Sequence, residues 1–320
     1  MSTEPPFRCH SLGAGDQSAY RIHTFPALRH LLDNAGDARI LAVGAVDGSN
    51  RPVGLALGHP SIAADDGQWA QLLSLYVQPE SRGAGVGSGL LSAFGALCLE
   101  RGLPEIRATY MTGQSSTATL ERFLASSGWS APEGRMLVIQ ATLESIKAAP
   151  WMKTFALPDR MEVVRWLDLT EQDRSGIRDS QREQAWVPAD LYPFDHEANC
   201  EPVTSLALKL EGRVVGWVIN HRVEGVLRFT CSFVHRRLQR MGRILLLYNE
   251  SVARMPLAGL QVGMWTVPVW HPAMAAFARR WMAPYATRFE ETRGVRLRLA
   301  QPPDNHAHRN GGNTATNPTG

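Results

Sequence analysis

Four glycines lie within residues 82–89, which read "RGAGVGSG". An apolar run with strand-like alternation precedes them, and a run with helical spacing follows. A turn of this kind presents the unpaired backbone amides of a helix N-terminus, where the helix dipole favours negative charge. Gly85 and Gly87 leave the backbone open to close approach, and Arg82 adds positive charge. These residues predict a binding site for a diphosphate.

Two common phosphate loops do not fit this stretch. The sequence has no GxxxxGK[ST] pattern, which excludes a P-loop. GxGxxG is not matched cleanly, and no acidic partner for a ribose follows at the right strand end. The strand before the glycines is also expected in an antiparallel meander, whereas a dinucleotide fold needs a strand–helix–strand unit.

A histidine in residues 186–202, "WVPADLYPFDHEANCEP", is the second candidate for chemistry. His196 stands between Asp195 and Glu197, and an imidazole titrates near neutral pH. A neighbouring carboxylate would orient the ring and raise its basicity. We therefore expect His196 to act as a general base, with Asp195 as the next candidate. Two other histidines are weaker candidates, His235 and His271.

The elements that carry these residues occur twice along the chain. Helical spacing in residues 16–34 is followed by three strands of an antiparallel meander and then by helix, strand, helix and strand. Residues 161–300 repeat this order. "LYVQPESRGAGVGSGLL" aligns without a gap with "SFVHRRLQRMGRILLLY" at an offset of 157, which matches Val77 with Val234 and Gly85 with Gly242. The repeat predicts a duplicated domain.

The expected fold is α/β with mixed sheets. Its two tandem domains are placed at residues 1–147 and 160–301, and the boundary falls in a segment with two prolines and no strand pattern. Residues 302–320 are polar and rich in Pro, Gly and Asn, so we expect a disordered tail.

The pattern Arg82-x-x-Gly85-x-Gly87, between "LYV" and "GLL", resembles the acyl-CoA pyrophosphate loop of the GNAT N-acyltransferase superfamily. That signature is [Q/R]-x-x-G-x-[G/A], between the fourth strand and the third helix. The order of elements in each half is also similar to the GNAT fold, so the resemblance covers nearly residues 5–300 in two copies. It implies tandem GNAT domains that use acyl-CoA as a co-substrate.

The resemblance also implies roles for individual residues. Backbone amides after Gly85 would hold the CoA pyrophosphate, and the end of the preceding strand would pair with the pantetheine. The expected cofactor-binding residues are Leu75, Tyr76, Val77, Arg82, Gly83, Ala84, Gly85, Val86, Gly87 and Ser88.

The second copy of the loop reads Gln239-x-x-Gly242-x-Ile244. Isoleucine replaces the last glycine, and its branched side chain would crowd a diphosphate. The second half is therefore expected to complete the fold and to form one wall of an acceptor site, in a cleft between the halves. The chain should bind one CoA.

The two usual GNAT catalytic positions hold other residues in this sequence. Family members often carry a Glu on the fourth strand, but "QLLSLYV" and its repeat "LRFTCSFV" have no carboxylate. A Tyr often stands four residues before the Gly of the fourth helix, where this chain has Leu124. A backbone N–H near Leu75 and Tyr76 is expected to stabilise the oxyanion. Thr112 and Ser116 are candidates near the thiol, although helix capping is the simpler role for both.

A tandem GNAT of this length with the segment "DLYPFDHE" is similar to the N-acyltransferases of teicoplanin-type glycopeptide biosynthesis. That resemblance implies transfer of a fatty acyl chain from CoA to the glucosamine amine of a glycopeptide pseudoaglycone, with His196 as base. Nine tryptophans are consistent with a bulky acceptor.

Two alternatives stay open. Mycothiol-synthase-type enzymes also have two domains, but their second domain carries the intact loop and an Asn-rich segment, whereas this chain reads "TVPVWHPAMAAF" there. A non-catalytic acyl-CoA-binding module would explain the missing Glu and Tyr.

The composition is that of an ordinary globular chain, with 44% hydrophobic residues and a net charge of +3. This balance gives no argument for nucleic acid. Four cysteines without CxxC spacing predict neither zinc nor a disulfide framework. No signal peptide and no apolar run of about 18 residues is recognisable. We expect a cytoplasmic monomer without a metal.

Overall fold

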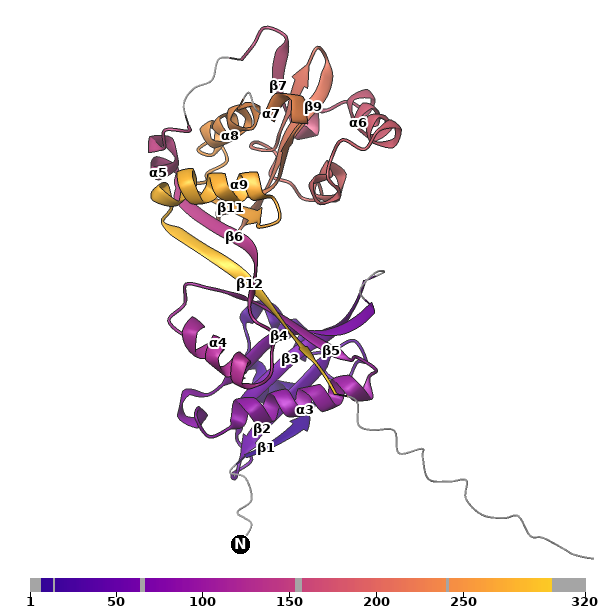
Figure 1. Cartoon of the computed structure of the whole chain (residues 1–320), viewed down its shortest axis with the longest axis vertical. Helices are drawn as coiled ribbons and strands as arrows, with labels where there is room; N and C mark the ends of the chain where they lie inside the picture. The colour runs from indigo at the N-terminus through magenta and orange to yellow at the C-terminus, as the bar shows by residue number, and fades with distance from the viewer. Residues whose placement is uncertain (1–6, 14, 64–66, 153–156, 240–241, 301–320) are drawn as a thin grey trace, which may run out of the picture. The chain divides into compact units, whose positions relative to one another are not determined.

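The computed structural model describes residues 7–13, 15–63, 67–152, 157–239 and 242–300 (Figure 1). The chain forms two compact units. The first consists of Met1–Thr109, Ala118–Pro132 and Gly294–Gly320, and the second of Tyr110–Thr117 and Glu133–Arg293. The predicted tail, 302–320, lies outside the described residues.

The first unit is built on a mixed sheet. Four antiparallel strands follow one another, and a fifth lies parallel to the fourth. These strands are β1 (Phe7–Ser11), β2 (Leu41–Asp47), β3 (Pro52–Ala63), β4 (Gly67–Val77) and β5 (Glu105–Met111). The end of β12 (Arg288–Arg298) lies beside β5, where Leu299 N–H donates to the Pro104 carbonyl at 2.9 Å.

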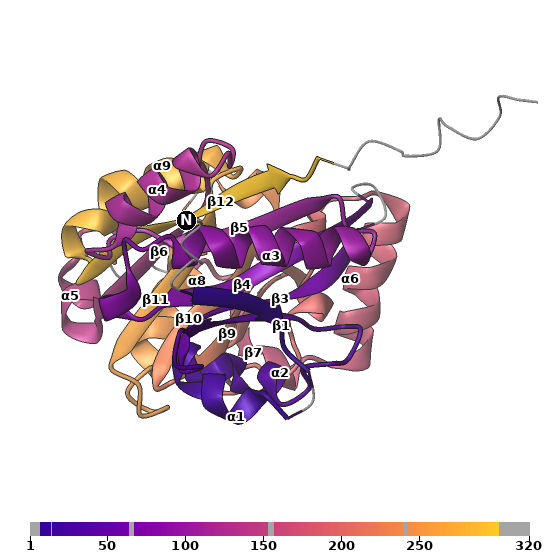
Figure 2. The ribbon, with the colours of Figure 1, turned by 90° about the horizontal axis from the view of Figure 1, so that it is seen from below.

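Helices cover both faces of this sheet (Figure 2). Leu55 and Leu57 point to one face, where they pack with Tyr20 at the end of α1 (Gln17–Tyr20) and Leu32 at the end of α2 (Arg29–Leu32). Gly54 faces the opposite side, against α3 (Val86–Glu100). The fourth helix is α4 (Thr117–Ser126).

The helix expected over residues 16–34 is wrong in its extent. The structure has α1 and α2, four residues each, joined by 3-10 turns and an extended stretch at Thr24 and Phe25. Pro26 has no amide hydrogen and disfavours helical geometry in the residue before it, so it ends the first segment.

The second unit repeats this plan. Its strands lie in the order β6-β11-β10-β9-β8-β7, and the start of β12 lies next to β6. They are β6 (Glu133–Thr142), β7 (Met161–Arg165), β8 (Leu206–Leu210), β9 (Arg213–Val223), β10 (Val226–Val234) and β11 (Val262–Pro268). The helices are α5 (Leu143–Ala148), α6 (Glu171–Glu183), α7 (Arg236–Gln239), α8 (Arg243–Arg254) and α9 (Pro272–Phe277), which continues as a π-helical turn. α6 and α8 pack on opposite faces of the sheet.

The two copies agree in hydrogen-bond register. In the first unit Ala70–Leu72 pair in parallel with Ile106–Ala108, and in the second Leu227–Phe229 pair with Gly263–Trp265, so both strands are offset by 157 residues. One extra residue follows each stretch, Leu73 in β4 and Thr230 in β10, again at this offset. The predicted α/β fold with two tandem copies is confirmed, including the register of these two strand pairs.

The compact units nevertheless cut across the halves expected from the sequence. β6, expected as the last strand of the first half, lies in the second unit and pairs antiparallel with β11 from Val262–Thr142 to Pro268–Met136. β12, expected to end the second half, finishes in the first unit. An alternating strand pattern shows which residues face a core but does not name the partner strand, so either sheet would satisfy it. The halves 1–147 and 160–301 stay a prediction about the duplication.

Candidate active site

The glycine loop of the first unit joins β4 to α3. Gly83 and Gly85 have φ of +80° and +85°, in the left-handed region that costs other L-residues about 1–2 kcal/mol. Gly85 is the residue that immediately precedes α3. Residues 82–85 are exposed, including Ala84. The glycines therefore allow a tight turn that leaves the loop backbone accessible.

The first turn of α3 presents unused backbone amides. Gly89 N–H donates to the Gly85 carbonyl at 2.9 Å, whereas the amides of Val86, Gly87 and Ser88 have no acceptor in the part of the chain that the structure describes. α3 is 15 residues long, so its dipole adds positive potential at this end. This arrangement suits an anionic group such as a diphosphate.

Arg82 shapes the loop as well as charging it. Its Nε donates to the Val77 carbonyl at 3.1 Å. In the second unit Gln239 Nε2 donates to the Val234 carbonyl at 2.9 Å, which is the same contact at the same offset. The first position of the loop thus has a structural role, the bond to the strand end, which is separate from its charge.

The strand before the loop has an open edge. β4 pairs with β5 only through Leu72, while the pairing with β3 continues to Val77. Beyond the extra residue at Leu73, the edge of β4 that carries Leu75, Tyr76 and Val77 has no strand partner among the described residues. An extended ligand with amide groups can pair there as an added strand. The expected pantetheine-binding residues therefore lie at an accessible strand edge.

The second loop differs in two respects. Gly242 keeps φ at +67° and precedes α8, but Leu245 N–H already donates to the Gly242 carbonyl at 2.9 Å. This amide corresponds to the unused amide of Ser88. Ile244, which stands for Gly87, packs against the core of the second unit. Fewer amides and a branched side chain make this loop a poor diphosphate site.

His196 lies in the second unit, at the end of a 3-10 turn over Pro193–Asp195. Its Nε2 is 3.0 Å from the carbonyl oxygen of Asp190. A carbonyl only accepts, so Nε2 must carry the proton, and the neutral ring has its lone pair on Nδ1. If His196 acts as a base, it acts through Nδ1.

The expectation that a flanking carboxylate orients His196 is wrong. The ring is held by a backbone carbonyl, and Asp195 is exposed. Glu197 is used elsewhere, because its carboxylate accepts from Arg174 at 2.6 Å and from Trp166 Nε1 at 2.9 Å. In a tight 3-10 turn, neighbouring side chains diverge, so adjacency in sequence did not become contact.

Sequence reasoning missed Asp190 and underrated His271. His271 Nε2 lies 2.7 Å from Asp190 Oδ2, and Trp270 Nε1 lies 3.3 Å from the same oxygen. Burial alone would raise the pKa of Asp190, but the hydrogen bonds from His271 and Trp270 outweigh it and leave the pKa below its ordinary value. The only sequence signal was the place of Asp190 in the same loop as His196.

His23 is a second residue that the sequence did not single out. It is buried in the first unit, its ring lies 5.4 Å from that of Tyr76, and its Nε2 is 2.9 Å from Gln78 Nε2. Burial lowers its pKa, which favours the neutral ring. In the second unit Phe233 stands for Tyr76 and contacts Trp186 and Trp217 instead. The polar contact between His23 and Gln78 therefore belongs to the copy with the intact loop.

Thr112, a weaker candidate near the thiol, is occupied by strand pairing. Its amide donates to the Glu291 carbonyl at 2.8 Å, and its hydroxyl accepts from Glu291 N–H at 2.9 Å. Ser116 is exposed. Neither observation points to catalysis.

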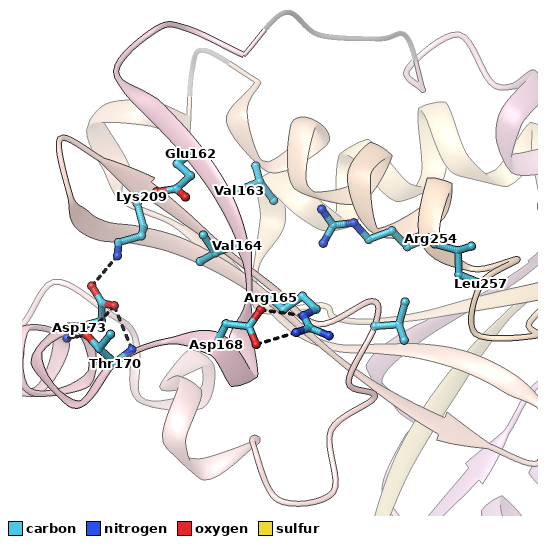
Figure 3. Close-up of a pocket in the computed structure, with 11 residues that line it drawn as sticks. Glu162, Val163, Val164, Arg165, Asp168, Thr170, Asp173, Lys209, Arg254 and Leu257 are labelled. Carbon is cyan, nitrogen blue, oxygen red and sulfur yellow. Dashed lines mark hydrogen bonds and ion pairs between the residues drawn. The ribbon is translucent and has the colours of Figure 1, made fainter.

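The cavity of about 680 Å³ in the second unit is a poor candidate for the site (Figure 3). Four of its charged side chains are paired with each other, since Arg165 contacts Asp168 at 2.7 Å and Lys209 contacts Asp173 at 2.8 Å. It contains none of the predicted site residues. A groove of about 520 Å³ in the first unit runs along α3 and has Ser88 in its wall.

Residues 8–124 match the model of the Acetyltransferase (GNAT) family. This stretch of the first unit is therefore similar to a GNAT domain. The match includes the glycine loop and both strands that flank the open edge. The predicted GNAT fold and enzyme class are confirmed. A comparison with curated proteins found no match.

Solved structures extend the likeness to both units. A tandem GNAT protein of the clavulanic acid biosynthesis pathway is 15% identical, with a TM-score of 0.60 over 92% of this chain and 99% of that one. A GCN5-related N-acetyltransferase from Sphaerobacter thermophilus is 15% identical, with a TM-score of 0.58 over 94% and 98%. At this identity the likeness establishes the fold, which is a tandem GNAT fold.

A third structure is a glucosamine N-acetyltransferase region of a fungal multi-domain β-N-acetylglucosaminidase. It is 13% identical, with a TM-score of 0.59 over 92% of this chain. The chain spans 38% of the length of that protein.

Within this fold, acyl-CoA fits the first unit. The three unused amides of α3 and the open edge of β4 are suited to its diphosphate and its pantetheine. A Cβ on Gly87 would lie 3.4 Å from the Phe123 ring and 3.8 Å from Val77 Cγ2. The glycine therefore leaves this part of the loop without a side chain beside the amides. No described helix is both long and apolar enough to cross a membrane.

Proposed function

We propose that the chain transfers a long-chain acyl group from acyl-CoA to the amine of an amino sugar on a glycopeptide pseudoaglycone. The observation that carries the acyl-CoA part is the set of unused amides at Val86, Gly87 and Ser88, next to the open strand edge. In the second copy of the loop the amide of Leu245 is already used and Ile244 replaces a glycine, so one acyl-CoA is expected for each chain.

Two observations favour an amino sugar as acceptor. The segment "DLYPFDHE" resembles the N-acyltransferases of teicoplanin-type glycopeptide biosynthesis. One structure of the same fold is described as a glucosamine N-acetyltransferase region. An amino-sugar amine is only weakly basic, so a large fraction is neutral near pH 7 and mild base assistance is enough.

The reaction needs no covalent intermediate. The neutral amine attacks the thioester carbonyl, the new C–N bond forms, and the C–S bond breaks to release the CoA thiolate. His196 is proposed to take the amine proton on Nδ1, with Asp195 as the second candidate, and the thiolate takes up a proton from solvent or the protein. Backbone amides near Leu75 are proposed to stabilise the oxyanion.

The proposal is tested by thiol release with decanoyl-CoA or acetyl-CoA and a glycopeptide pseudoaglycone as acceptor. We expect CoA release with decanoyl-CoA that depends on the acceptor. The variant His196→Ala should reduce kcat at least about tenfold, with acyl-CoA affinity nearly unchanged. A wild-type rate in this variant removes His196 from the mechanism.

Other outcomes separate the alternatives. Activity with acetyl-CoA and a cysteinyl pseudodisaccharide, without activity on decanoyl-CoA, would favour a mycothiol-synthase type. CoA binding without release to any amine would favour a non-catalytic module.

A further inference from the structure

Asp190 accepts three hydrogen bonds, from donors in two parts of the second unit. The residue belongs to the 3-10 turn Ala189–Leu191. Its backbone carbonyl accepts from His196 Nε2 at 3.0 Å, and its carboxylate Oδ2 accepts from His271 Nε2 at 2.7 Å and from Trp270 Nε1 at 3.3 Å. These four residues, Asp190, His196, Trp270 and His271, are called the Asp190 cluster below.

The proton positions in the cluster follow from its acceptors. A carbonyl oxygen and an ionised carboxylate oxygen can only accept, so Nε2 carries the proton in both imidazoles. Each ring, when neutral, then has its lone pair on Nδ1. One residue thus fixes the same tautomer in His196 and in His271, and both have a basic nitrogen on the side away from Asp190.

The neighbouring residue anchors this arrangement. The Leu191 carbonyl accepts from Trp217 Nε1 at 3.3 Å and from Cys231 Sγ at 3.3 Å, and both donors belong to buried side chains of the sheet. Burial raises the pKa of Cys231 to about 12, so this thiol stays neutral beside the cluster. Asp190 therefore stands on a rigid support, as an orienting residue requires.

The side chains of the Asp190 cluster are exposed enough to contact a ligand. The side chains of His271 and Asp190 are 28% and 39% exposed, and Trp270 is 56% exposed. Such an exposed ion pair contributes little to stability. Among the described residues no group of three or more His, Cys, Asp or Glu is placed to hold a metal ion, so metal binding does not explain the cluster.

We propose that Asp190 is a positioning residue of the N-acyl transfer, which holds His196 and His271 as bases that act through Nδ1. His271 is thereby a second imidazole that can take the amine proton. This inference rests on the proposed function and goes beyond it, because it assigns the carboxylate and the second histidine.

The test compares Asp190→Ala with the wild type in CoA release and in ¹⁵N NMR of the histidine rings. The variant removes the carboxylate but keeps the backbone carbonyl. We expect kcat to fall a few fold, because His271 loses its orientation while the carbonyl that holds His196 is kept, and the KM for acyl-CoA should stay the same. The NMR spectrum should show that His271 loses its Nε2–H preference and that His196 keeps it. Asp190→Asn, which retains an acceptor oxygen, should recover part of the His271 preference.

Asp168→Ala is the matched control, because Asp168 is also an exposed carboxylate of the second unit in an ion pair, with Arg165 at 2.7 Å. It should leave kcat and both histidine spectra unchanged. An unchanged kcat in Asp190→Ala, or an unchanged His271 spectrum, overturns the inference. If the wild type releases no CoA, the proposed function fails, and the NMR comparison still tests the tautomers.

Discussion

At the scale of single residues, the second copy of the loop acts as a comparison within the same chain. Position 82 holds Arg and position 239 holds Gln, yet both side chains donate to the carbonyl five residues earlier. Position 87 holds Gly and position 244 holds Ile. The contact that shapes the turn is kept in both copies, while the features that would accommodate a diphosphate are kept in one.

This comparison predicts different effects for two substitutions of Arg82. Gln keeps the bond to the Val77 carbonyl, as Gln239 shows, but loses the positive charge. Ala loses both. We expect Arg82→Gln to bind CoA a few fold more weakly, and Arg82→Ala to lose a further factor of about 2–12, which is the worth of a typical hydrogen bond. Calorimetric titration at two salt concentrations measures both effects.

Salt dependence provides the control for this prediction. CoA affinity of the wild type should depend more strongly on salt than that of Arg82→Gln, because the charge is gone in the variant. Equal affinities for Arg82→Gln and Arg82→Ala would show that the bond to Val77 has no influence on the loop.

The turn formed by the glycine loop could be predicted from sequence, whereas the contacts around His196 could not. A glycine loop presents backbone amides, so the spacing of its glycines is enough to predict its geometry. The tautomer of His196 depends on a carbonyl six residues away, which two 3-10 turns bring next to the ring. His271 lies 81 residues from Asp190, and no local pattern connects the two.

At the scale of elements, the type of each strand was predictable and its partner was not. Alternating apolar residues predicted β6 and β12, but both would suit either sheet. Pro26 divided an expected helix that apolar spacing alone had joined. Strand pairing thus rests on contacts distant in sequence, whereas element type rests on local pattern.

Close packing at one glycine in each copy gives a prediction at this scale. A Cβ on Gly54 would lie 2.9 Å from the Tyr76 carbonyl oxygen, and one on Gly216 would lie 2.9 Å from that of Phe233. Gly54→Ala and Gly216→Ala should each lower the free energy of unfolding by about 1–3 kcal/mol. Urea denaturation followed by tryptophan fluorescence measures the change.

Gly176 is the matched control, since it lies inside α6 and a Cβ there would meet nothing within 4 Å. Gly176→Ala should raise stability by about 0.5–1 kcal/mol, because alanine loses less backbone entropy in a helix. If Gly54→Ala is as stable as the wild type, the strand pairing around position 54 is not as described.

At the scale of the whole molecule, the chain contains two copies of one fold with unequal loops. The register of both sheets is the same at an offset of 157 residues. Differences between the copies are therefore local and chemical. The first copy has three unused amides and a polar contact at His23, and the second has a filled loop and an aromatic core.

The central claim is that only the first loop binds acyl-CoA. Isothermal titration of CoA into the wild type and into Gly87→Ile, which copies the residue of the second loop into the first, tests it most directly. We expect one CoA per chain for the wild type and at least tenfold weaker binding for Gly87→Ile, roughly 1.4 kcal/mol or more. Gly87→Ala should fold normally, because its Cβ would make only ordinary contacts with Phe123 and Val77. Two CoA molecules per chain, or unchanged affinity in Gly87→Ile, would contradict the account.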